Sequence, residues 1–175
     1  FLGTADLSIA EVSAVPRKGF RAQFVFQPGG VAQAHQEEGE VMFPIFEHRT
    51  EQGSAKLELQ DESDGTQRLF SLAAPVLDVL KHGRVLVVDE LDRSLHTLLV
   101  RRLVGMFHDP VLNPRGAQLV FSTHDTSLLD HTLFRRDQVW FAEKDDTQAT
   151  RIFPLSDFSP RKHEAWERGY LMGRY

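Results

Sequence analysis

The fold of this chain is decided by the stretch Arg84-Val85-Leu86-Val87-Val88-Asp89-Glu90. Its four consecutive branched apolar residues are typical of a strand buried on both faces, as in a parallel sheet. The pattern then predicts a helix over Leu95–Phe107, a loop over Pro110–Gly116 and a second buried strand over Ala117–Ser122 (AQLVFS). Strand, helix and strand at this spacing form a βαβ unit, which indicates the α/β class.

The segments around this unit predict further elements. Alternating apolar and polar residues before this unit predict antiparallel strands with one solvent-exposed face. These strands are expected over Leu7–Val15, Phe20–Phe26, Val41–His48 and Ala55–Gln60. The polar stretch Gln27–Glu40 predicts a loop. A periodic apolar face predicts a helix over Thr66–Lys81, which Pro75 could kink or break. Later segments predict a short helix over Thr126–His131, third and fourth strands over Gln138–Ala142 and Arg151–Pro154, and a helix over Pro160–Tyr170.

Composition limits the class of protein. The 175 residues fit one domain, and the lack of cysteine excludes a disulfide framework and cysteine-based zinc or nucleophile chemistry. No apolar run approaches the roughly 20 residues of a membrane span, and no signal-peptide pattern opens the chain, so we expect a cytoplasmic protein without a membrane partner. The net charge of −5 gives no argument for nucleic-acid binding.

Two carboxylates, Asp89 and Glu90, follow the first buried strand directly. Ligands of open α/β sheets bind at the carboxyl ends of the strands. There one carboxylate can hold Mg²⁺ while the next polarises an attacking water. The alternative interpretation is a strand that ends in a solvated acidic turn.

The second buried strand ends in Ser122-Thr123-His124-Asp125. If the two strands are neighbours, His124 lies at the same edge as Glu90, where it can donate a hydrogen bond to a γ-phosphate or to the attacking water. The alternative is an ordinary helix N-terminus that Thr123 or Asp125 caps.

A third candidate site is the helix start Ser63-Asp64-Gly65-Thr66. Its backbone N–H groups, hydroxyls and helix dipole favour an anion, although Glu62 and Asp64 weaken such a site. The alternative is an ordinary capped helix N-terminus.

In combination, these motifs resemble the C-terminal part of an ABC-type ATPase. The closer resemblance is to AAA-labelled ATPases of the abortive-infection and overcoming-lysogenization-defect type, relatives of the SMC and RecF chromosome ATPases. Residues 63–70 (SDGTQRLF) are similar to the signature motif, residues 89–96 (DELDRSLH) to the Walker B motif and D-loop, and residues 116–126 to the switch-histidine strand. The resemblance is strong from Glu62 to the end and weak before it.

The resemblance implies an architecture. Residues 61–175 would form the second lobe of a P-loop NTPase, with a mainly parallel sheet flanked by helices. Residues 1–60 would form an antiparallel strand-rich region that leads into it. Two positions are unusual. Asp64 stands where transporter-type ABC proteins usually carry Gly, although the resembled family tolerates Asp there, and Thr97 follows His96 where relatives usually have Pro; neither change removes a catalytic group.

The resemblance also implies the role of each site residue. Asp89 would hold Mg²⁺ through water, Glu90 would be the general base, and His124 would contact the γ-phosphate of ATP. The remaining residues would bind an ATP held by a second protomer or lie at the seam of that homodimer: Ser63, Gly65, Thr66, Ser94 and His96.

The phosphate-binding loop is missing from these 175 residues. That loop requires Gly-x-x-x-x-Gly-Lys-Ser/Thr, and none of the five lysines follows a glycine. Together with the first residue, Phe1, this leads us to expect a piece of a larger protein whose N-terminal ATPase half is a partner. We expect the isolated chain to bind ATP poorly and not to hydrolyse it.

The biological role has several interpretations at this point. Relatives of the abortive-infection type act beside an effector protein, so phage defence with an effector partner is the expected context. The alternatives are a nucleotide-gated scaffold with little hydrolysis, a DNA-repair or chromosome ATPase that contacts DNA, and a metal-dependent nuclease or phosphatase built on His124, Asp125, Asp130 and His131.

Overall fold

The computed structural model describes residues 9–26, 32–51, 53–158 and 165–175. The chain divides into two compact units, Phe1–Ser71 and Leu72–Tyr175. The boundary between the units falls within helix α1 (Asp64–His82). None of the helices in the described part of the chain has the length and apolar character that a membrane span requires.

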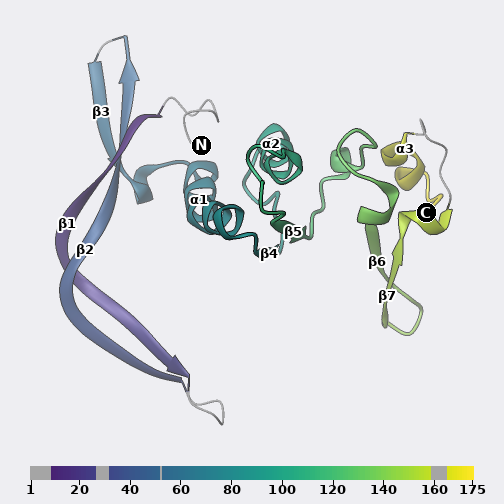
Figure 1. Ribbon diagram of the computed structural model, residues 1–175, viewed down its shortest axis with the longest axis horizontal. Helices are drawn as coiled ribbons and strands as arrows, with labels where there is room; N and C mark the ends of the chain where they lie inside the picture. The colour runs from purple at the N-terminus through teal and green to yellow at the C-terminus, as the bar shows by residue number, and fades with distance from the viewer. Residues whose placement is uncertain (1–8, 27–31, 52, 159–164) are drawn as a thin grey trace. The chain divides into compact units, whose positions relative to one another are not determined.

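The first unit contains a three-stranded antiparallel sheet in the order β1-β2-β3. Its strands are β1 (Ile9–Phe26), β2 (Ala32–Thr50) and β3 (Gly53–Glu58). Figure 1 shows β1 and β2 as a long curved ribbon, with β3 beside one end of β2. The antiparallel character expected for this region is confirmed.

The strand boundaries in this region differ from the prediction. The two strands expected before residue 27 are the single strand β1, and the expected loop over Gln27–Glu40 is replaced from Ala32 onward by β2. Pairing continues through Gly19 opposite Gly39, and residues 37–40 are exposed. Backbone hydrogen bonds hold this ladder, so polar side chains in contact with water do not interrupt it. The expected positions 7–8 and 27–31 lie outside the described residues.

Helix α1 agrees with the periodic pattern and continues through Pro75. Pro75 is exposed, so its ring lies on the wet face of the helix. Gly83 ends the helix with φ +68°, and the N–H of Arg84 donates to the carbonyl of Val79 at 3.1 Å, as in a Schellman motif. Between β3 and α1 the chain makes a 3-10 turn, η2 (Leu59–Asp61).

The second unit contains the predicted βαβ unit. Strand β4 (Val85–Val88) pairs in parallel with β5 (Gln118–Phe121), and helix α2 (Thr97–His108) connects them. The prediction that both faces of β4 are buried was wrong, because Val88 is buried while Val85 and Val87 are 56% and 72% exposed. Among the described residues β4 and β5 form a two-stranded sheet, in which side chains alternate between two faces.

The later strands correct the expectation of a mainly parallel sheet. Strand β6 (Trp140–Lys144) pairs with β7 (Thr150–Pro154) in an antiparallel hairpin of its own. The turn between them is short, and a parallel connection requires a longer crossover. Within the described ranges, β4 and β5 are the single parallel pair.

Short helices complete the second unit. The helix expected near Thr126 is the 3-10 turn η3 (Thr126–Leu128), and two more turns are η4 (Arg136–Gln138) and η5 (Leu155–Phe158). Helix α3 (Trp166–Leu171) covers the end of the last expected helix, whose positions 160–164 lie outside the described residues. Phe141 of β6 stacks on Tyr170 of α3 with ring centroids 5.2 Å apart.

Candidate functional site

The parallel pairing of β4 and β5 brings two of the predicted motifs together. Asp89 and Glu90 follow β4, and Ser122 follows β5. The Ser122 hydroxyl donates a hydrogen bond to Oδ1 of Asp89, and the backbone N–H of Glu90 donates to Oγ of Ser122 at 2.8 Å. Backbone bonds continue the pairing, from Ser122 N to Val88 O at 3.1 Å and from Leu91 N to Ser122 O at 3.0 Å. We call residues 89–90 and 122–124 the sheet edge.

Glu90 and His124 face each other at the sheet edge. Nε2 of His124 lies 3.9 Å from Oε1 of Glu90, which is too long for a direct hydrogen bond. The side chains are 87% and 45% exposed. Glu90 also has φ +49°, a left-handed conformation that costs energy for a residue other than glycine. Such strain is typical of functional sites.

The segment after Glu90 presents the residues expected at a dimer seam. Leu91 and Leu95 are buried and anchor this turn, while Ser94 and His96 are exposed. Ser94 has φ +60°. Nδ1 of His96 accepts a hydrogen bond from Leu98 N at 3.2 Å, so His96 caps the start of α2.

The signature segment, residues 62–66, belongs to the first unit and forms a capped helix start. The Thr66 N–H donates to Oγ of Ser63 at 3.2 Å, and the Ser63 and Thr66 hydroxyls lie 3.0 Å apart. Thr66 is only 3% exposed, whereas Ser63 is exposed and Gly65 half-buried. The expected capping is therefore present, with Ser63 as the cap.

A buried pair supports the signature segment, and sequence reasoning missed it. Nε2 of His48 in β2 lies 2.6 Å from Oε1 of Glu62, whose side chain is 4% exposed. The side chain of Gln67 donates to the backbone oxygen of Glu62 at 2.8 Å. His48 and Glu62 are 14 positions apart in the chain. The pairing of β2 with β3 brings them together, so no local sequence pattern could have shown the contact.

A second network, also missed, holds the turn after His124. Asp125 caps η3 by accepting a hydrogen bond from Ser127 N at 3.0 Å, which confirms the capping interpretation of Asp125. The cap is present together with the position of His124 beside Glu90 at the sheet edge. The other oxygen of Asp125 accepts from the Thr97 hydroxyl at 2.6 Å. Burial raises the pKa of Asp125, but hydrogen bonds from Ser127 and Thr97 outweigh this effect and lower it.

Arg101 extends this network along α2. Its guanidinium pairs with the carboxylate of Asp130 and donates to the Ser127 carbonyl at 3.2 Å. Burial raises the pKa of Asp130, yet hydrogen bonds from Arg101 and Thr132 dominate and lower it to about 2. The carboxylate is therefore charged at neutral pH.

The donor groups of the sheet edge suit a magnesium ion that a phosphate also holds. Mg²⁺ prefers oxygen ligands and is bound in such sites through one or two carboxylates, with water and phosphate completing the shell. Asp89 supplies a carboxylate whose orientation Ser122 fixes. Within the described ranges, no group of three or more His, Asp or Glu side chains is placed so that it could hold a metal by itself.

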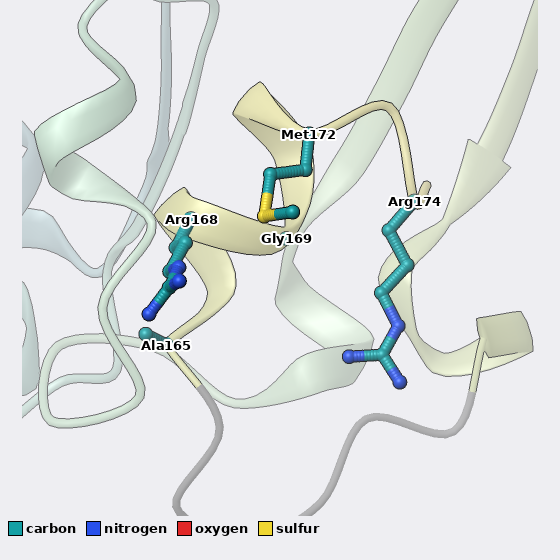
Figure 2. A pocket seen from close by; sticks show the side chains of 5 residues that line it. All are labelled: Ala165, Arg168, Gly169, Met172 and Arg174. Carbon is teal, nitrogen blue, oxygen red and sulfur yellow. The ribbon is translucent and has the colours of Figure 1, made fainter.

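A separate hollow of about 670 Å³ lies beside α3 (Figure 2). Its lining residues are Ala165, Arg168, Gly169, Met172 and Arg174. None of them belongs to the signature, Walker B, D-loop or switch-histidine segments, so we do not assign this hollow to the candidate site.

Comparison with known proteins shows to which family the chain belongs. A family model described as "AAA domain, putative AbiEii toxin, Type IV TA system" matches residues 4–130. The match begins well before Glu62, where the motif resemblance was weak, and it includes the signature segment and the sheet edge. Searches of curated proteins and of solved structures found no match. The matched residues are well over half of the chain, so the chain belongs to this AAA-domain family. Membership of the family indicates a nucleotide-binding, ATPase-like function.

Proposed function

We propose that this chain is the C-terminal half of an ABC-type ATPase and carries the groups that activate water for ATP hydrolysis. The observation that carries the proposal is the sheet edge, where one serine hydroxyl contacts both carboxylate residues and His124 faces Glu90. The family match supports an ATPase in general terms.

Asp89 and Glu90 have different roles in this proposal. Asp89, oriented by Ser122, is the residue that would hold Mg²⁺ through water. When bound, the ion neutralises developing charge on the phosphate oxygens. Glu90 is the general base, because its partly exposed carboxylate can accept a proton from an attacking water. His124 would donate a hydrogen bond to the γ-phosphate.

The signature segment is proposed to contact an ATP held by a second protomer. Backbone N–H groups at a helix start favour an anion, and Gly65 lets a phosphate approach closely. The Thr66 side chain is buried beneath Ser63 in this conformation, so we assign the direct contacts to Ser63 and Gly65. Ser94 and His96, which are exposed, would lie at the dimer seam.

The phosphate-binding loop must then come from another polypeptide segment. The 175 residues contain no Gly-x-x-x-x-Gly-Lys-Ser/Thr motif. We propose that an N-terminal ATPase half supplies it, and that the chain without this half does not hydrolyse ATP.

The deciding experiment compares wild type with Glu90→Gln, each combined with the half that carries the phosphate-binding loop. We expect phosphate release to fall by about 10²–10⁴-fold, the range for loss of a general base, while ATP binding persists and the dimer accumulates. Glu143→Gln, which changes an exposed carboxylate in β6, is the matched control and should keep wild-type turnover.

Other outcomes of the same assay would change the conclusion. Equal hydrolysis by wild type and Glu90→Gln would remove Glu90 as the base. Binding without hydrolysis in every variant would favour a nucleotide-gated scaffold.

Phage defence by abortive infection is the proposed context, with an effector as the proposed partner. The family description supports this context because it names AbiEii and a toxin–antitoxin system. Expression of the complete protein in a bacterial host, with and without Glu90→Gln, followed by phage infection, tests it. Phage yields that are equal in these two cultures and in the host without the protein would contradict it.

A further inference from the structure

A short hydrogen bond joins the first residue of helix α2 to the turn after His124. Thr97 is the first residue of α2, and its hydroxyl donates to Oδ2 of Asp125 at 2.6 Å. Oδ1 of Asp125 accepts from the backbone N–H of Ser127 at 3.0 Å and from its hydroxyl at 2.6 Å. Both oxygens of Asp125 are thus used, so the carboxylate is fixed between the helix and the turn.

The position of His124 depends on its neighbours in the chain. Its side chain is 87% exposed, so little packing can orient the ring. The N–H of Asp125 donates to the Thr123 hydroxyl at 3.0 Å, which closes a turn around His124. On the other side of this turn, Ser122 is bound to the residues that follow β4. The backbone that carries the imidazole is therefore held by Asp125 on one side and by Ser122 on the other.

Arg101 holds the same turn at a second point. It lies one helical turn after Thr97 and donates to the carbonyl of Ser127 at 3.2 Å. It also pairs with Asp130. Because Arg101 keeps the turn attached to α2, loss of the Thr97 hydroxyl should change the local geometry at Asp125 without detaching the turn.

We propose that Thr97 and Asp125 are positioning residues for His124. Thr97 directly follows the segment 94–96, which is expected at the dimer seam. The Thr97–Asp125 hydrogen bond therefore also connects that segment to the turn after His124. This inference rests on the proposed function for its catalytic consequence but not for its structural one. The carboxylate of Asp125 is a strong acceptor for these bonds, and against the opposing effect of burial its pKa is lowered by hydrogen bonds from Ser127 and Thr97.

The structural consequence is tested in the 175-residue chain by NMR. The ring resonances of His124, assigned by their loss in His124→Gln, are compared at one pH in wild type, Thr97→Val and Thr97→Ser. We expect valine to shift them and serine, which keeps the hydroxyl, to leave them near the wild-type position. Thr147→Val is the matched control, since it removes a threonine–aspartate hydrogen bond of 2.6 Å in the β6–β7 turn. His124 resonances that do not move in Thr97→Val would overturn the inference.

The catalytic consequence is tested with the phosphate-loop half present. We expect Thr97→Val to lower kcat for ATP by roughly tenfold or more, because small displacements of catalytic groups have effects of this size. KM should change little, and Thr97→Ser should restore turnover. Shifted resonances with unchanged kcat in an active enzyme would also overturn the positioning role. If wild type itself shows no turnover, the proposed ATPase fails, and the NMR comparison alone decides whether Thr97 orients His124.

Discussion

The signature segment and the sheet edge are built in opposite ways. In the signature segment, Thr66 is buried, Ser63 caps the helix, and Glu62 is buried against His48. At the sheet edge, Glu90 and His124 are substantially exposed, and Glu90 has a positive φ. Polar residues of the first region stabilise a helix start, whereas those of the second are presented to solvent at a conformational cost.

This difference teaches which residues of each motif are available to a ligand. In the signature segment the groups presented to solvent are Ser63, Asp64 and the backbone around Gly65, because Glu62 and Thr66 are buried. At the sheet edge the side chains themselves are presented. Substitutions should therefore reduce stability first in the signature segment and activity first at the sheet edge.

The largest effect on stability is expected from Glu62→Ala. It leaves His48, which is only 18% exposed, without its carboxylate partner, and an unsatisfied buried group costs about 1–3 kcal/mol. Hydrogen exchange of the first-turn amides of α1, with chemical denaturation followed by circular dichroism, measures the loss.

The matched control for Glu62→Ala is the double variant with His48→Ala. Because the two residues are in contact, their effects should not add, and the double variant should lose less stability than the sum of the single ones. Additive losses would show that the pair does not support the signature segment.

A smaller effect is expected from Asp130→Asn, which breaks the pair with Arg101. The pKa of Asp130 is lowered from 3.8 to about 2 in the folded state, so its ionised form stabilises the fold above the unfolded value. Allowing for its partial exposure, we expect a loss of about 1–2 kcal/mol at neutral pH. Denaturation between pH 7 and pH 2 should show the difference from wild type constant above about pH 4 and vanishing toward pH 2. A difference that persists unchanged at pH 2 would contradict this assignment.

The smallest effect on stability is expected from substitutions of Ser63. They also test most directly whether the signature segment only stabilises the fold or also binds a ligand. Alanine should cost about 1 kcal/mol through loss of the cap, and glycine only a few tenths of a kcal/mol. If Ser63 also contacts nucleotide, both variants should weaken ATP-dependent dimerisation equally in the complete protein, as measured by light scattering. Dimerisation that follows stability instead, weak with alanine and normal with glycine, would restrict Ser63 to capping.

Local patterns predicted the elements of the second unit better than those of the first. The apolar runs of β4 and β5 are properties of a few neighbouring residues, so they can be read along the chain. The length of β2 could not be predicted in this way, because its polar half is held by pairing with β1. Likewise, the pattern of β6 showed a strand but not its partner, and the antiparallel hairpin with β7 emerged only in the structure.

The sequence by itself determined the order of the motifs and the fact that acidic and histidine residues follow two apolar strands. It also determined that these 175 residues contain no Gly-x-x-x-x-Gly-Lys-Ser/Thr motif. Only the tertiary structure decided that Ser122 joins Asp89 to Glu90, that His48 supports Glu62 and that Thr97 holds Asp125. A hydrogen bond requires placement within a few tenths of an ångström, and for residues far apart in the chain that placement comes from strand register and helix packing.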